Sequence, residues 1–267
     1  MMKIGLYASM FGKENPPQLE SVESYIELAH ELNVDVIDFL SGRGFQSKET
    51  DYLLGVKRTC LKYGFSIGYL ASTGHFFGTD EDLAKKVLKA KDDARTASFM
   101  GSPLIRLFTG PPLDDPEDRA REIRCFQEIC DHAAECGIVV GLQNHPSTGD
   151  DMLRILRQTD RENFTVIMDT GQWLGSPARN KGQADPDVDT YRYMEQVAPH
   201  TSHVRAKFYK IDSGVEAWLD YQRIVRILRD AGFNGHLSVV FEGKEVNTCD
   251  DRTSLRLAVA HLRDILR

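Results

Sequence analysis

Four polar residues recur at nearly regular intervals in the second half of the chain. Gln143, Asp169, Arg205 and Glu242 are separated by 26, 36 and 37 residues. One strand–helix unit of an α/β protein takes about 30 residues, so the four can lie at a similar height on successive strands. Carboxylates transfer protons, and a guanidinium binds carboxylates through paired hydrogen bonds. The spacing therefore predicts that two carboxylates, an amide and a guanidinium converge on one site.

The segment that contains Arg205, "SHVRAKFYK" (202–210), carries an unusual amount of positive charge for a strand with apolar neighbours. Alternation along a strand places His203, Arg205 and Lys207 on one face. A solvated face would explain this pattern, and so would a reaction site. Lys207 could form a Schiff base with a carbonyl compound, or it could be held in a salt bridge.

The elements that would position these residues alternate along the whole chain. Apolar, β-branched runs predict strands, and amphipathic stretches between them, such as 19–33, 81–100 and 221–232, predict helices. Gly64, Gly101, Gly137 and Gly232 stand where helices should end. The predicted strands are Lys3 to Ala8, Val34 to Leu40, Phe65 to Ala71, Pro103 to Phe108, Ile138 to His145, Phe164 to Thr170, Ser202 to Tyr209 and His236 to Gly243.

Eight strand–helix units in this length predict an α/β fold, a single (β/α)8 TIM barrel that spans residues 1–267 as one domain. The main alternative is a doubly wound open sheet, but the first strand–helix turn lacks GxGxxG. Chemistry in a barrel takes place at the C-terminal ends of the strands. The polar residues expected there are His75, Arg106, Gln143, Asn144, His145, Asp169, His203, Arg205, Lys207 and Glu242.

Composition limits the class of protein. The chain has 267 residues and a net charge of −7, which does not favour binding to a nucleic-acid backbone, and it has no Lys/Arg block. Neither a signal peptide nor an apolar run long enough for a membrane helix is evident. The cysteines number five, an odd count without zinc-ligand spacing, so we expect neither a disulfide framework nor a zinc site. These features favour a cytoplasmic protein.

Four segments in the second half resemble motifs of one superfamily. "GLQNHP" is similar to its ENH motif, "MDTGQWLG" to its DTGN-type motif and "SHVRAKFY" to its HVHxKD-type strand. The segment 217–243, which ends in "FEG", resembles its closing segment. The chain thus resembles the xylose-isomerase-like barrels, the sugar phosphate isomerases and epimerases that are also grouped with endonuclease-IV-type proteins (AP endonuclease family 2).

The resemblance implies a divalent metal, Mn²⁺ or Mg²⁺, held by a Glu, an Asp, a His and a second Glu. Asp169 and Glu242 match this pattern, whereas Gln143 replaces the first Glu and Arg205 replaces the His. An amide is no general base near neutral pH, and a guanidinium offers no lone pair. Two alternatives follow. Either Gln143, Asp169, His203 and Glu242 hold a metal, or Arg205 takes the metal's electrostatic place and no metal binds.

The resemblance implies a carbohydrate isomerase or epimerase that transfers a proton next to a carbonyl. Glu242 would be the base, Arg205 or a metal would stabilise the enolate, and His145 or Lys207 would return the proton. Expected substrate contacts are His75, Arg106, Asn144 and Trp173. For most of these residues a purely structural role is the alternative.

Other functions fit the same barrel. One is a lyase of the C-glycoside-cleaving type acting on 3-keto sugars, and another is a non-catalytic barrel that binds a sugar or a partner subunit. A DNA-repair endonuclease ranks last, because those relatives use many histidines and this chain has eight. We expect a small carbohydrate as substrate, neither nucleic acid nor membrane as partner, and a homo-oligomer or a partner subunit as the possible assembly.

Overall fold

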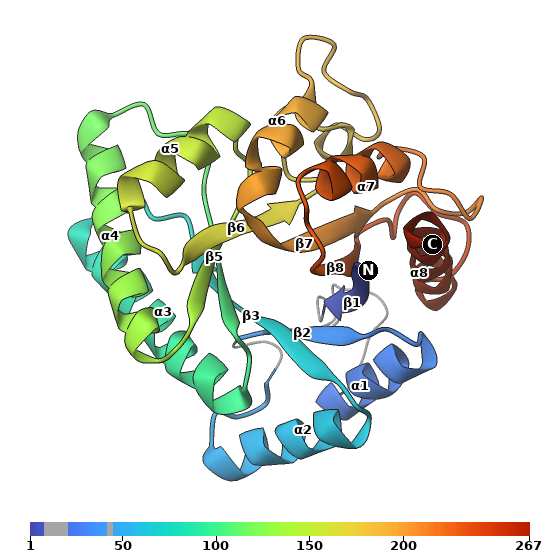
Figure 1. The fold of residues 1–267 in the computed structure, drawn as a ribbon, viewed down its shortest axis with the longest axis horizontal. Helices are drawn as coiled ribbons and strands as arrows, with labels where there is room; N and C mark the ends of the chain where they lie inside the picture. Colours follow the sequence, from blue (N-terminus) through green and yellow to red (C-terminus); the bar gives the residue numbers. More distant parts are fainter. Residues whose placement is uncertain (8–20, 42–44) are drawn as a thin grey trace.

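The strands form one closed barrel of eight parallel strands in sequence order, with β1 paired to β8 (Figure 1). The computed structural model describes residues 1–7, 21–41 and 45–267. The closed barrel of parallel strands, each followed by a helix, confirms the predicted (β/α)8 TIM barrel. Its strands are β1 (Lys3–Tyr7), β2 (Val36–Leu40), β3 (Ser66–Gly74), β4 (Leu104–Phe108), β5 (Val139–Gln143), β6 (Phe164–Asp169), β7 (Thr201–Phe208) and β8 (His236–Phe241).

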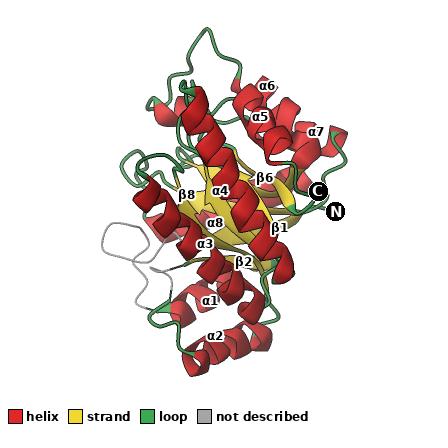
Figure 2. Cartoon of the chain, turned by 90° about the vertical axis from the view of Figure 1, so that its left-hand side faces the viewer, coloured by secondary structure: helices red, strands yellow, loops and turns green. Residues whose placement is uncertain are grey.

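The helices surround the barrel, so that the strands are enclosed by a ring of helices (Figure 2). They are α1 (Val22–Glu31), α2 (Thr50–Lys62), α3 (Asp80–Met100), α4 (Pro116–Glu135), α5 (Gly149–Thr159), α6 (Thr190–Val197), α7 (Tyr221–Asp230) and α8 (Asp251–Leu266). Side chains of Ser, Thr or Asp accept a hydrogen bond from the first turn of most of them, for example Asp115 at α4 and Asp220 at α7. Gly64, Gly101, Gly137 and Gly232 have positive φ, as their predicted position after a helix requires.

Strand alternation sorts the side chains into two groups. Those facing the helices form the large hydrophobic core, and a smaller apolar cluster fills the inside of the barrel. That inner cluster consists of Tyr7, Tyr69, Ala71, Leu104, Ile167 and Val240. On β7, His203, Arg205 and Lys207 share one face, as alternation predicted. All three are buried and contact side chains on or next to the other strands. The three cations therefore belong to the interior and not to a solvated face.

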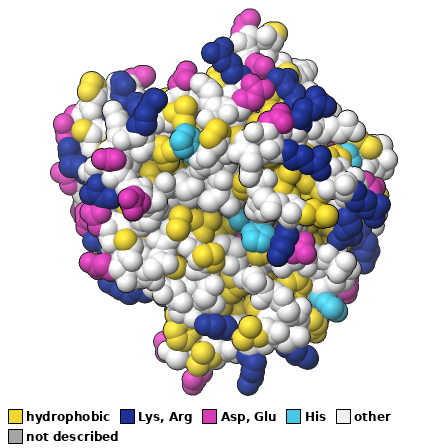
Figure 3. All heavy atoms as spheres, in the orientation of Figure 1, with side chains coloured by type: hydrophobic (Ala, Val, Ile, Leu, Met, Phe, Trp, Pro, Cys, Tyr) yellow, Lys and Arg dark blue, Asp and Glu magenta, His cyan; other side chains and the backbone are white. Residues whose placement is uncertain are grey.

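The surface shown in Figure 3 carries charged side chains mainly toward its edge and hydrophobic side chains toward its centre. All five cysteines are free thiols, which agrees with the absence of a disulfide framework. Within the described residues, no helix is both long and apolar enough to cross a membrane.

Candidate active site

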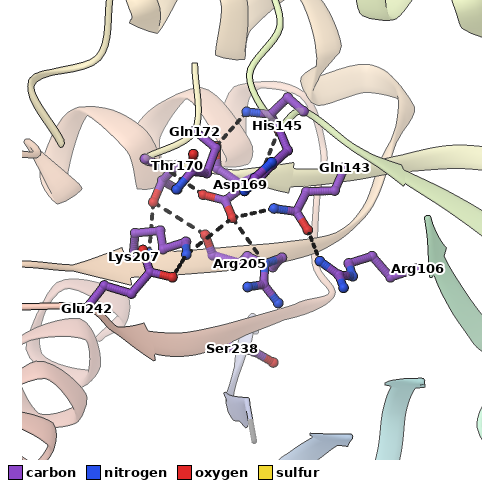
Figure 4. A network of polar contacts seen from close by, with 12 residues as sticks. Arg106, Gln143, His145, Asp169, Thr170, Gln172, Arg205, Lys207, Ser238 and Glu242 are labelled. Carbon is purple, nitrogen blue, oxygen red and sulfur yellow. Dashed lines mark hydrogen bonds and ion pairs between the residues drawn. The ribbon is translucent and has the colours of Figure 1, made fainter. Parts of the chain in front are cut away.

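Most of the predicted polar residues, among them Gln143, Asp169, Arg205 and Glu242, meet at the C-terminal ends of β5 to β8 (Figure 4). Asp169 ends β6 and lies opposite Arg205 of β7 in the parallel register. Gln143 ends β5, and Glu242 directly follows β8. The regular spacing in the sequence thus corresponds to neighbouring strand ends in space.

Asp169 is fully buried at the centre of this network. Its Oδ2 accepts hydrogen bonds from Gln143 Nε2 at 2.8 Å and Arg205 Nε at 3.0 Å. Lys207 Nζ lies 3.8 Å from the same oxygen, and Oδ1 accepts the backbone N–H of Gly171 at 3.0 Å. Both carboxylate oxygens are therefore occupied by donors from the protein itself.

Arg205 is anchored on the opposite side by two tyrosines. Its Nη1 donates a hydrogen bond to the Tyr69 hydroxyl, and its guanidinium lies over the Tyr7 ring at 4.1 Å from the centroid. Cation–π contact and charge-assisted hydrogen bonds hold a guanidinium in one fixed orientation. Arg205 is thus fixed between Asp169, Tyr69 and Tyr7.

Lys207 and Glu242 form the second ion pair of the site. Lys207 is buried and its Nζ donates to Glu242 Oε1, while the Tyr209 hydroxyl lies 3.4 Å from Oε2. Burial raises the pKa of Glu242, but the ion pair with Lys207 and the charge of Arg205 outweigh burial, so the net shift is downward. Because 39% of its side chain is exposed, Glu242 is a charged carboxylate that a ligand can reach.

Gln143 links the network to Arg106 on β4. Its Oε1 accepts a hydrogen bond from Arg106 Nη1 at 2.5 Å, and its Nε2 donates to Asp169. An arginine only donates and a carboxylate only accepts, so this orientation of the amide is fixed by its partners. The amide therefore turns its NH₂ group toward Asp169, and its carbonyl oxygen points away.

This donor set does not fit a divalent cation. A metal between Asp169 and Glu242 would need lone pairs where the protein places the NH groups of Gln143, Arg205 and Lys207. Over the described ranges, no group of three or more His, Cys, Asp or Glu is arranged to hold a metal ion. Gln143, Asp169, His203 and Glu242, the ligands of the metal-binding alternative, are thus not assembled around a common point.

His203 lies too deep in the barrel to join that set. Its Nε2 is 2.9 Å from Ser238 Oγ and 3.2 Å from Asp38 Oδ2, the latter without hydrogen-bond geometry. A cavity of about 430 Å³ at the N-terminal ends of the strands is lined by His203 and His236. His203 therefore faces the end of the barrel opposite to Glu242, because it precedes Arg205 by one full strand repeat.

His145 and His75 form an aromatic cluster with Phe108 at the mouth. The His75 ring lies 4.7 Å and the His145 ring 5.0 Å from the Phe108 ring, centroid to centroid. Burial lowers the pKa of His145 to about 4, and burial also lowers that of His75. His145 is consequently uncharged at neutral pH and offers no imidazolium proton to a substrate.

Two residues expected to touch the substrate have structural roles instead. Asn144 Nδ2 donates to the Asp169 carbonyl oxygen at 2.9 Å, and its Oδ1 accepts the Asp169 N–H at 2.8 Å. Trp173 is fully buried and packs against Tyr193. The expectation that Trp173 stacks on a sugar is wrong, because its ring is fully buried against Tyr193 of α6.

Sequence reasoning missed the tyrosines of the site. Tyr7 and Tyr69 hold Arg205, and Tyr209 contacts Glu242. Alternation along β3 would have placed Tyr69 inside the barrel with Ala71. A tyrosine is also an ordinary core residue, however, so its type alone gave no signal.

Comparisons with known proteins agree with this architecture. The family model described as xylose isomerase-like TIM barrel matches residues 26–265. A D-psicose 3-epimerase from Clostridium cellulolyticum H10 is 16% identical, with a TM-score of 0.75 and 100% of both chains covered. A 3-keto-D-glucoside 4-epimerase from E. coli is 17% identical, with a TM-score of 0.74 over 99% of this chain and 100% of that one.

A probable 3-DHS dehydratase from Bacillus anthracis is 19% identical, with a TM-score of 0.72 over 100% of this chain and 99% of that one. A search of the curated proteins gave no match. At these identities the structural matches show the common fold. Since the family model covers most of the sequence, the chain belongs to the xylose isomerase-like TIM barrel family.

Proposed function

We propose that this protein is a carbohydrate isomerase that transfers a proton next to a carbonyl group with cationic side chains in place of a divalent metal. The observation that carries the proposal is the arrangement of Arg205 and Lys207 against Asp169 and Glu242. Epimerases among the structurally similar proteins support the choice of a carbohydrate as substrate.

Glu242 is the general base of this proposal. Its carboxylate is charged at neutral pH and partly exposed at the barrel mouth, where a substrate C–H can approach it. Lys207 orients it through Oε1, and the Tyr209 hydroxyl lies next to Oε2. A base held by two neighbours loses little freedom when the substrate binds.

Lys207 is the group that stabilises the enolate. Its Nζ lies between Glu242 and Asp169, so its positive charge is adjacent to the atom that removes the proton. Negative charge develops on the substrate oxygen in the same step, and a buried cation stabilises it more strongly than water does. As Glu242 becomes protonated, Lys207 can turn from the neutralised carboxyl to the enolate oxygen.

The arrangement favours isomerisation over epimerisation. A two-base epimerase needs a second proton-transfer group on the opposite face of the substrate. Gln143 replaces the first Glu of the family pattern and has no basic atom, and both oxygens of Asp169 already accept hydrogen bonds. Among the described residues, Glu242 is the one carboxylate of the site that is exposed. This suits a single base that carries a proton between adjacent carbons, while the proton of the neighbouring hydroxyl passes to the former carbonyl oxygen within the enediolate.

The test is exchange of the α-proton of ketoses in D₂O, followed by ¹H NMR. We expect exchange that survives EDTA and disappears in Glu242→Gln. Glu245→Gln, in the same loop and exposed, is the matched control and should exchange like the wild type. Absence of exchange with every ketose would favour the non-catalytic binding protein, and exchange that requires added metal would refute the cationic mechanism.

A further inference from the structure

Arg106 is a buried guanidinium that has no anionic partner among the described residues. It is 6% exposed, and its Nη1 donates to Gln143. Its Nε is buried without any hydrogen-bond partner, and no carboxylate of the described residues lies within ion-pair distance of it. The guanidinium edge formed by Nε and Nη2 is therefore unused.

The carboxylates of the site do not neutralise Arg106, because each is already paired. Asp169 accepts from Arg205, and Glu242 accepts from Lys207. Asp38, deeper in the barrel, accepts the Tyr69 N–H and lies beside His203. Counted over residues 1–7, 21–41 and 45–267, the C-terminal site thus has three cations to two carboxylates, in a protein whose overall charge is −7.

Leaving this charge uncompensated is unfavourable. Burial lowers the pKa of Arg106 and repulsion from Arg205 acts in the same direction, whereas Tyr7, Tyr69 and Asp169 offset only part of this shift. A guanidinium nevertheless stays protonated in proteins, so the positive charge persists. A buried charge without a partner destabilises the folded protein, and such a cost is typical of sites that await a ligand.

The guanidinium of Arg106 is planar and lies next to aromatic rings, so the group that binds it is expected to be planar as well. Phe108 lies beside the guanidinium, 5.0 Å from ring centroid to Cζ, and His145 packs on Phe108. The free edge presents two parallel N–H groups, the geometry that binds the two oxygens of a carboxylate. We propose that Arg106 binds a carboxylate of the substrate, so that the preferred substrates of the isomerase are sugar acids. This inference rests on the proposed function and adds a substrate class to it.

The experiment compares three ketoses that differ only at C6: D-fructuronate, D-fructose and D-fructose 6-phosphate. Their dissociation constants are measured by titration calorimetry with the wild type, Arg106→Gln and Arg106→Lys. If Arg106 forms a pair of charge-assisted hydrogen bonds with the carboxylate, the wild type should bind fructuronate at least about tenfold more tightly than fructose. Arg106→Gln should bind both equally. Arg106→Lys should keep part of the preference, because it retains the charge and loses the planar fork.

Each other result has a defined meaning. Equal affinity of the wild type for fructuronate and fructose would refute the carboxylate site and leave the isomerase proposal standing. Tighter binding of the phosphate would refute the carboxylate assignment. A preference that persists in Arg106→Gln would refute the role of Arg106. Failure of all three sugars to bind at millimolar concentration would overturn both the inference and the carbohydrate function.

Discussion

The Nε of Arg205 lies 3.0 Å from Oδ2 of Asp169, on adjacent strands and at paired positions of the register. Both side chains are buried, and the same oxygen also accepts from Gln143. The charge of Asp169 is therefore balanced by side chains of the barrel itself.

Replacing Arg205 by alanine should strongly destabilise the protein. Loss of one partner of a buried ion pair typically costs about 3–5 kcal/mol, because the remaining charge is desolvated and unpaired. Urea unfolding monitored by circular dichroism measures this loss. Arg124→Ala is the control, since its pair with Glu117 is solvent-exposed and should contribute about 0–1 kcal/mol. Equal effects of the two substitutions would contradict the buried ion pair.

Replacing Lys207 by glutamine should raise the pKa of Glu242. The ion pair with Lys207 lowers that pKa in the wild type, whereas burial acts in the opposite direction. ¹³C NMR titration of the Glu242 carboxyl carbon follows the shift. Lys210→Gln, which removes the partner of Asp212 instead, should leave the Glu242 titration unchanged. An unaltered Glu242 titration in Lys207→Gln would show that the two groups are not coupled.

Glu122, on α4, should make the protein less stable as the pH rises toward neutrality. Burial raises its pKa from 4.5 to about 7, Asp151 adds to the shift, and Arg154 partly offsets it. The folded pKa exceeds the unfolded one, so the stabilisation is complete below about pH 4.5 and is lost as the pH rises to about 7. Glu122→Gln should flatten this profile by roughly 3 kcal/mol, and the exposed Glu128→Gln should not. A wild-type stability that is flat between these limits would contradict the shift.

His145 should stay neutral well into the acid range. Burial lowers its pKa to about 4, so its imidazole resonances should titrate below pH 5 and the rate profile should lack a histidine inflection near pH 6.5. Its folded pKa lies below the unfolded one, so acidification from about pH 6.5 to about pH 4 also destabilises the protein. An inflection near pH 6.5 that disappears in His145→Gln would restore His145 as the proton donor.

Most of the fold could be predicted from the sequence because alternating β-branched and amphipathic runs fix the order of elements. The start of β7 was predicted within one residue, as Ser202 against the observed Thr201. The strand ends were less certain, and β5 stops at Gln143, before the predicted end at His145. There the backbone turns so that Asn144 can bind the backbone of Asp169.

The sequence predicted which strand ends carry the residues of the site, but it did not predict which of their side chains contact one another. Spacing brought Gln143, Asp169, Arg205 and Glu242 together, since parallel strands in a barrel keep a common height. Spacing could not show that the amide oxygen of Gln143 accepts a hydrogen bond from Arg106, or that Lys207 pairs with Glu242. Those contacts depend on rotamers, which each side chain adopts according to the charges around it.

Thermal melting with and without Mn²⁺ or Mg²⁺ tests the central claim, that side-chain cations stand where relatives would hold a metal. The wild type, Arg205→His and the double variant Gln143→Glu/Arg205→His are compared after treatment with EDTA. Only a folded state that binds the ion melts higher when the ion is added. We expect no shift for the wild type and a rise in Tm for the double variant, in which lone pairs replace both NH groups. A wild type that micromolar Mn²⁺ already stabilises would contradict the account.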